Sequence, residues 1–322
     1  MRIAVSGMLL LAALALPATS LAADPMDLRP AYPDQWDLSP DNSLRFETGL
    51  RYWLSWGEQD AGFAVPNLGD VTLGVRDNSH IVEAHGRIDD LYTNTFLKAQ
   101  AGLALATTGT YAIAPAGAGS IGAHSQIGYA GFDYGWMPLG QLDGPFALGG
   151  FAGYTYWKDA PDIGTGQVAT SFAGGMPGAL VAAPDNLDIH ALRLGVRGTA
   201  EAGPIDFQGE VAFVPYAHVS GALGGSGPNG FMFPGWPAIY ENAQTPLTGW
   251  GSGVMTEAMV GFHPTDNLTL RLGGRAWYLQ GELDATFNGE VPGFGALPPQ
   301  NLSSSFASIF RYGALFEVAG RF

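Results

Sequence analysis

Charged side chains recur at regular spacings along two neighbouring stretches of the sequence. Arg193, Arg197 and Glu201 lie four residues apart, and Asp206 and Glu210 follow after a Gly-Pro pair. In an extended strand alternate side chains point to the same face, so each set projects from one face of its strand. Bases that lie opposite acids on adjacent strands attract each other. The chemistry that this spacing favours is a ladder of ion pairs.

The residue types that carry catalysis or bind metals are not arranged for either task. None of the six histidines has the spacing of a metal site: His80, His85, His124, His190, His218 and His263. No Gly-x-Ser-x-Gly elbow, phosphate-binding loop or nucleophile with a neighbouring base occurs. The net charge of −15 opposes binding to nucleic acid. The sequence therefore predicts no catalytic residue, no metal, no cofactor and no nucleic-acid partner.

The last twelve residues show which element carries such a ladder. One set of alternate positions is apolar and ends in an aromatic residue, and the other set carries three charges. The apolar set includes Phe316, Val318 and Phe322, and the charges are Arg311, Glu317 and Arg321. A strand that is apolar on one face and charged on the other is what a transmembrane β-barrel requires. Its apolar, aromatic end also resembles the C-terminal strand by which outer-membrane barrels are recognised for assembly.

Nine further segments have a similar character. The expected strands are 44–56, 80–89, 93–106, 122–137, 146–158, 188–202, 205–219, 252–263, 268–281 and 306–322. Each is long enough for the roughly 9–11 residues that a tilted membrane-spanning strand needs. Short connections alternate with long ones at 58–78, 107–121, 159–187, 220–250 and 282–305, as in barrels with short periplasmic turns and long external loops. The fold class predicted is an all-β, antiparallel, up-and-down transmembrane barrel of about ten strands.

The N-terminus and the composition support this class. Residues 1–22 read as a cleaved signal peptide, residues 23–42 as a periplasmic or lumenal segment, and residues 43–322 as the barrel. Charged residues make up 13% of the chain, against about 25% in soluble domains, and there is no Cys. We expect the protein in the outer membrane of a Gram-negative bacterium, in contact with membrane lipid, lipopolysaccharide and the barrel assembly machinery. The oligomeric state stays open.

The inner face of this barrel should hold most of the bases. The candidate lumen-lining residues are Arg45, Glu47, Arg51, Glu83, Arg87, Arg193, Arg197, Glu201, Asp206, Glu210, Glu257, Arg271, Arg275, Arg311 and Glu317. A charge on the lipid face costs about 2–4 kcal/mol at the membrane midplane, so charged side chains that face the lumen give the lower free energy. Two interpretations stay open: a structural filling of salt bridges, or the electrostatic lining of a narrow pore.

Five short segments carry a family resemblance. They are His80-Ile-Val-Glu-Ala-His-Gly-Arg-Ile-Asp89, Leu192-Arg-Leu-Gly-Val-Arg-Gly198, Ala212-Phe-Val-Pro-Tyr216, Gly274-Arg-Ala-Trp-Tyr278 and Arg311-Tyr-Gly-Ala-Leu-Phe316. With the ten-strand layout they make residues 44–322 similar to the omptin-like outer-membrane barrels, in particular uncharacterised ones of alphaproteobacteria. The resemblance implies two catalytic aspartates in the second external loop and an Asp–His couple after the seventh strand.

This chain departs from the catalytic pattern. The segment from Thr107 to Ser120 contains no acid, and no Asp lies beside His218. Without carboxylates to activate water or orient an imidazole, hydrolysis lacks its base, and we expect no enzymatic activity. The expected function is porin-like passage of small solutes through an Arg/Glu-lined lumen. The alternative is a structural or surface-interaction barrel with a filled lumen, and an omptin-type protease is the weaker third option.

Overall fold

The structure is a computed structural model, and its described part begins at the first strand. The described residues are 43–65, 69–114, 117–121, 125–161, 167–171, 177–181, 186–223, 240–241, 245–287, 289–291, 295–296 and 298–322. The expected signal peptide and the segment 23–42 lie outside them. Among the described residues, none belongs to a helix that is long and apolar enough to cross a membrane.

Ten long strands make up most of the described residues. They are β1 (Leu44–Val65), β2 (Gly69–Asp90), β3 (Thr95–Ala114), β5 (Gln126–Gly140), β6 (Phe146–Ala160), β9 (Asn186–Ala202), β10 (Ile205–Leu223), β12 (Thr245–Thr265), β13 (Leu268–Phe287) and β16 (Gln300–Arg321). The short strands are β4 (Gly117–Ser120), β7 (Gln167–Ser171), β8 (Pro177–Val181), β11 (Tyr240–Glu241), β14 (Gly289–Val291) and β15 (Gly295–Ala296).

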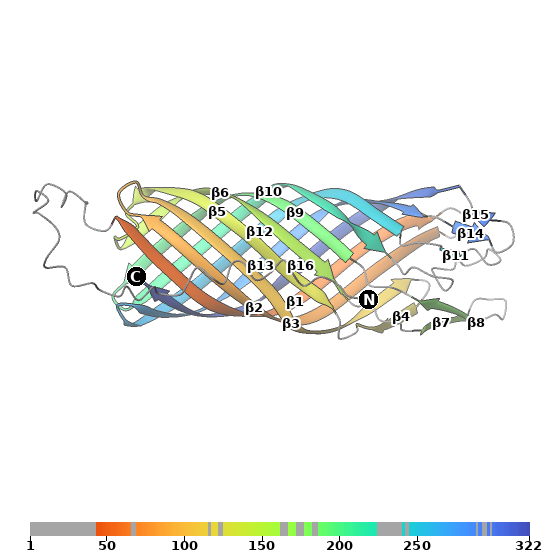
Figure 1. Cartoon of the computed structure of the whole chain (residues 1–322), viewed down its shortest axis with the longest axis horizontal. Helices are drawn as coiled ribbons and strands as arrows, with labels where there is room; N and C mark the ends of the chain where they lie inside the picture. The colour runs from red at the N-terminus through yellow and green to blue at the C-terminus, as the bar shows by residue number, and fades with distance from the viewer. Residues whose placement is uncertain are drawn as a thin grey trace, which may run out of the picture. The chain divides into compact units, whose positions relative to one another are not determined.

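The ten long strands close on themselves. Their order is β2-β1-β16-β13-β12-β10-β9-β6-β5-β3, every pair is antiparallel, and the pairing of β2 with β3 completes the ring. Figure 1 shows the strands winding obliquely around the barrel. The sequence-based prediction of an all-β, antiparallel, ten-stranded barrel is therefore confirmed.

The ring is joined where the first and last strands meet. β1 and β16 pair from Glu47 opposite Arg321 to Phe63 opposite Ser304. Phe46 N donates to Phe322 O at 3.0 Å, and Phe322 N donates back to Phe46 O at 2.9 Å. The terminal residue predicted as an assembly signal thus completes the backbone ladder that closes the barrel.

One end of the barrel carries tight turns, and we call it the short-turn end. Gly203, with φ +61°, and Gly140, with φ +81°, occupy backbone conformations that glycine adopts without steric cost. In the turn after β2, the amide of Tyr92 donates to the Asp90 carboxylate at 3.0 Å. The short strands β7, β8, β11, β14 and β15 lie at the opposite, long-loop end (Figure 1).

The strands extend further toward the long-loop end than the sequence predicts. Segments 58–78, 107–121, 159–187, 220–250 and 282–305 were expected to be loops. In the structure β1 continues to Val65, β2 starts at Gly69, and β16 starts at Gln300. The prediction was wrong here because it relied on an apolar outer face. Beyond the membrane that face no longer needs to be apolar, while backbone pairing continues.

The outer wall is the face that lipid solvates. Its middle presents exposed aliphatic side chains such as Leu194, Val196, Val211 and Leu272. Aromatic residues flank this band toward both ends. Exposed aromatics near the short turns include Trp136, Phe146, Phe207 and Phe262, and those further along the strands include Tyr52, Trp56, Tyr216, Trp250 and Tyr278. An apolar band between two aromatic girdles is the outer surface of a transmembrane barrel.

Candidate functional site

The candidate site is the lumen, where the strand register gathers the charged side chains. All fifteen lumen residues expected from the sequence alternate with lipid-facing residues along their strands. Twelve of the fifteen are at most 7% exposed: Arg51, Glu83, Arg87, Arg193, Arg197, Asp206, Glu210, Glu257, Arg271, Arg275, Arg311 and Glu317. Arg45 and Glu47 are partly buried. Glu201 differs, since it lies exposed at the short-turn end.

The first layer of side chains lies nearest the short turns. Arg271 contacts Glu47 at 2.9 Å, Asp206 at 3.2 Å and also Glu317. Arg321 joins Glu47 at 3.2 Å to the exposed Glu201 at 3.3 Å. One arginine thus contacts three acids from three other strands and links those strands across the lumen.

The same layer continues on the other side of the lumen. Arg45 contacts Asp89 at 2.8 Å and also donates to the backbone oxygen of Leu142 at 2.8 Å. Arg87 contacts Asp89 at 2.6 Å. Because Leu142 belongs to the turn between β5 and β6, Arg45 reaches from β1 across the short-turn end of the lumen.

A central layer is organised around two glutamates. Glu83 of β2 contacts Arg51 of β1 at 2.9 Å and Arg275 of β13 at 2.6 Å. Glu257 of β12 contacts Arg275 at 2.5 Å and Arg51 at 3.3 Å. Two bases and two acids form an alternating ring with no net charge, and each carboxylate is shared by both guanidinium groups. The central layer therefore spans from β1 and β2 to β12 and β13.

Glu210 forms the other half of the central layer. It contacts Lys98 at 3.0 Å, Arg193 at 3.0 Å and Arg197 at 2.8 Å. Arg193 also contacts Asp133 at 3.0 Å. Lys98 of β3 and Glu210 of β10 are four strands apart around the ring, so this contact crosses the lumen.

Four inward aromatic side chains form the next layer: Trp53, Tyr129, Trp157 and Trp277. The Trp277 ring lies edge-on to Trp53, Tyr129 and Trp157, with ring centroids 5.2, 4.9 and 5.5 Å apart. The Arg275 guanidinium lies 5.0 Å from the Trp53 centroid and 5.3 Å from that of Trp277. Such contacts are favourable when desolvated, so the aromatic layer packs directly on the central ions.

A polar layer lies beyond the aromatic layer, toward the long loops. Arg311 of β16 contacts Asp77 of β2 at 2.8 Å and Asp159 of β6 at 3.1 Å. It also donates to the Ser55 hydroxyl at 3.1 Å. Strands β16 and β6 are five strands apart in either direction around the ring, so Arg311 spans the full width of the lumen.

Sequence reasoning missed Asp77 and Asp159 because both fall in segments expected to be loops. A signal for them existed. Arg311 was placed inward on the last strand without an acid at its level on either expected neighbour, and a buried guanidinium requires a partner. The aromatic layer was also missed, although the period of two places Trp53 on the same face of its strand as Arg51 and Ser55.

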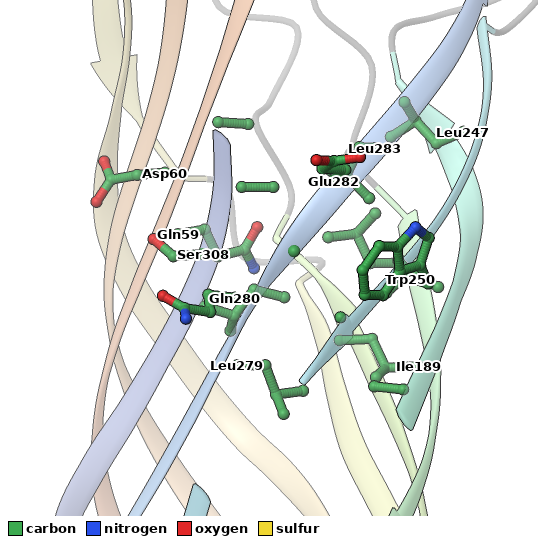
Figure 2. Close-up of a pocket in the computed structure, with 18 of the residues that line it drawn as sticks. Gln59, Asp60, Ile189, Leu247, Trp250, Leu279, Gln280, Glu282, Leu283 and Ser308 are labelled. Carbon is green, nitrogen blue, oxygen red and sulfur yellow. The ribbon is translucent and has the colours of Figure 1, made fainter. Parts of the chain in front are cut away.

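The lumen ends in a partly enclosed cavity of about 50 Å³ at the long-loop end, which we call the vestibule. Figure 2 shows side chains from several strands converging on it. Its buried lining is apolar and includes Phe63, Leu187, Ile189, Val219, Leu247 and Leu279. A second, polar cavity of about 20 Å³ lies at the short-turn end between Arg45, Arg87, Asp206 and Arg321.

His218 lies on the outer wall rather than in the lumen. Its ring stacks on His190, with centroids 6.5 Å apart, and the Tyr154 hydroxyl lies 2.5 Å from His190 Nδ1. Among the described residues, no group of three or more His, Cys, Asp or Glu side chains is arranged to hold a metal. The histidine that resembled a catalytic residue therefore faces the lipid headgroup region.

Comparisons with known proteins find solved β-barrel structures whose sequence identity and structural similarity to this chain are both low. No protein-family model matches the chain, and no curated protein matches it. The translocator domain of the autotransporter NalP from Neisseria meningitidis is 15% identical, with coverage of 85% of this chain and 88% of that chain and a TM-score of 0.35. The P. putida toluene transporter TodX is 10% identical, with coverage of 87% and 90% and a TM-score of 0.25. At these values the likenesses assign neither family nor function.

Proposed function

We propose that the protein is an outer-membrane β-barrel with a filled, non-conducting lumen, and that it acts at the cell surface through its long-loop end. The observation that carries this proposal is the set of contacts that cross the lumen. Arg311 meets Asp159 on the opposite strand at 3.1 Å, and Arg275 meets the hydroxyl of Tyr129, again from the opposite strand, at 2.8 Å.

Energetics support a filled lumen. Removing one partner from a buried ion pair costs about 3–5 kcal/mol, since the other charge is left without compensation. A path wide enough for a solute would have to break the ion pairs of the central layer and of the Arg311 layer. It would also have to separate the aromatic side chains that lie between these two layers. The aromatic layer adds edge-to-face contacts, each worth about 0.5–1.5 kcal/mol beyond its buried area. The lumen is therefore filled by ion pairs and aromatic side chains that connect opposite walls, and we call this set of contacts the brace.

Passage of small solutes is the second candidate. It is favoured by the two cavities, which lie at opposite ends of the same lumen. Passage requires that Arg311 and the central layer move aside together. An arginine and glutamate lining would then favour small polar solutes over apolar ones.

We also propose that the protein is not an enzyme. His218 stacks on His190 at the outer wall, and the inward acids Asp77 and Asp159 are both held by Arg311. A general base must be within hydrogen-bond reach of the proton that it removes. Cleavage of a fluorogenic peptide by the refolded barrel with lipopolysaccharide, above the rate of a boiled sample, would contradict this proposal.

Single-channel recording in planar bilayers separates a filled barrel from a pore. We expect no conductance steps from the wild-type protein, with a known porin as the positive control in the same bilayers. The charge-neutral double variant Glu83→Ser with Arg275→Ser leaves the aromatic layer and the Arg311 layer in place, so it should also be silent. Adding Trp277→Ser, Asp77→Ser and Arg311→Ser removes residues of all three layers and should give conductance. Steady conductance from the wild type would refute the filled-lumen proposal and favour passage.

A further inference from the structure

The vestibule differs in chemistry from every other layer of the lumen. The layers below it are charged or aromatic, whereas Ile189, Val219, Leu279 and Leu283 give the vestibule an aliphatic wall. These side chains are at most 9% exposed. An apolar, concave surface at the solvent end of a lumen does not contribute to the ion-pair brace, and it is the kind of lining that small-molecule sites use.

One buried polar group faces this apolar wall. Gln59 is the lining residue, among those that the structure describes, that is both polar and buried, at 7% exposure. Its amide interacts with the carboxylate of Asp159, but no acceptor meets the distance and angles of a normal hydrogen bond with Nε2. Figure 2 shows the Gln59 amide pointing toward the cavity. A buried donor without a good acceptor costs about 1–3 kcal/mol. A ligand that places an acceptor there would recover part of this cost as binding free energy.

We propose that the vestibule binds a small neutral molecule with a slim alkyl chain and an oxygen that accepts a hydrogen bond from Gln59 Nε2. Ketones and alcohols have this chemistry. The oxygen would lie at the floor on Gln59, and the alkyl chain would extend along Leu279 and Val219. This inference rests on the proposed function, because a filled lumen makes the vestibule a blind pocket.

Charge excludes anionic ligands. Asp159 lies fully buried beside Gln59 beneath the cavity. Two other lining residues, Asp60 and Glu282, do not hold a cation toward the cavity, because Glu282 is exposed and Asp60 pairs with Arg76 on the outer face at 2.9 Å. The nearest base in the layer below, Arg311, is already held by two carboxylates. A fatty-acid or phosphate group would therefore enter a negative environment without a free cation.

Size excludes bulky ligands. The volume of about 50 Å³ is well below the roughly 150 Å³ of an apolar cavity that holds benzene. A ring would not enter fully, whereas the narrow end of an alkyl ketone would. The partly open side of the cavity leaves room for the rest of the chain.

The test uses 2-hexanone and its isostere 2-methyl-1-hexene, in which a methylene group replaces the oxygen. Binding to the folded wild-type barrel in lipid nanodiscs is measured by saturation-transfer NMR titration. We expect the ketone to bind more tightly than the alkene. Gln59→Leu should weaken ketone binding about three- to tenfold and leave the alkene unchanged, since one hydrogen bond is lost.

Two further variants complete the design. Ala217→Leu fills the cavity and should abolish binding of both probes. Gln126→Leu is the matched control, because Gln126 is exposed on β5 and is not among the residues that line the cavity. It should bind like the wild type. Heat-dependent gel mobility confirms that each variant is folded.

Equal binding of both probes to wild type and to Ala217→Leu would mean partition into lipid and would overturn the site. An unchanged ketone preference in Gln59→Leu would overturn the role of its amide. If the wild type does not conduct, either result refutes only the proposed ligand site, and the proposal of a filled lumen stands. Wild-type conductance would instead remove the proposed function itself.

Discussion

At the residue scale, stability depends on acids that serve more than one base. Glu83 is fully buried and accepts hydrogen bonds from Arg51, Arg275 and the hydroxyl of Tyr129. A carboxylate with several charge-assisted bonds stabilises its neighbours as well as itself. The loss of its charge would leave two guanidinium groups to share Glu257 and Glu317.

Glu83→Gln should therefore destabilise the barrel by about 3–5 kcal/mol, because it leaves a buried base without full compensation. The measurement is urea unfolding in detergent or lipid, followed by gel mobility. Glu58→Gln is the matched control. Glu58 and Arg76 are both more than 40% exposed and lie 3.6 Å apart, so its cost should stay below about 1 kcal/mol. Equal effects of the two substitutions would contradict the brace.

At the element scale, β16 has a double role. It pairs with β1 on one side and with β13 on the other, and so it closes the ring. Its outward face carries Phe316, Val318 and Phe322, all at least half exposed. Its inward face carries Arg311 and Glu317, which reach into the polar and central regions of the lumen. The same strand thus serves lipid contact, closure and bracing.

Phe322→Ala tests the assembly role of this strand. Phe322 is 74% exposed, so truncation of its side chain should change the stability of the finished barrel little. We expect severalfold less folded protein in the outer-membrane fraction, measured by the heat-modifiable gel band. Phe262→Ala is the control, because Phe262 is also exposed, at 51%, but lies on β12. The same loss in both variants would show a general effect of removing a lipid-facing aromatic residue.

At the scale of the whole molecule, two solvents shape the barrel. Lipid requires an apolar outer band, and the closed lumen requires that every inward charge be paired. Val211 lies between Phe207 and Tyr216 along β10, near the middle of the outer band. Ile205 lies at the start of the same strand, directly after the Gly203 turn.

Val211→Arg should cost about 2–4 kcal/mol, and Ile205→Arg about 0–1 kcal/mol, because the cost of a lipid-facing arginine falls from the midplane to the interface. Unfolding in lipid vesicles measures both. A larger cost for Ile205→Arg than for Val211→Arg would mean that the membrane midplane lies nearer the short-turn end than the aromatic girdles indicate. Similar costs for both substitutions would contradict a lipid-facing outer wall.

The sequence alone determined the wall of this barrel. Alternation along each strand is local, so the face of Arg51 or Glu317 follows from its position relative to its neighbours. Partners across a short turn also follow from local register, as for Arg275 opposite Glu257 and Arg197 opposite Glu210. Beyond the lipid-facing band, polar side chains occupy both faces of a strand, so apolar and polar residues no longer alternate. For this reason Asp77 was assigned to a loop although it belongs to β2.

Only the tertiary structure decided what fills the lumen. Contacts such as Glu83 with Arg275 join residues 192 positions apart, and Arg311 with Asp159 join residues 152 apart. Which layers meet across the lumen depends on the stagger of ten strands around the ring, a property that no single hairpin encodes. The same holds for the vestibule, because its aliphatic wall exists only where β9, β10, β12 and β13 curve around one side of the closed barrel.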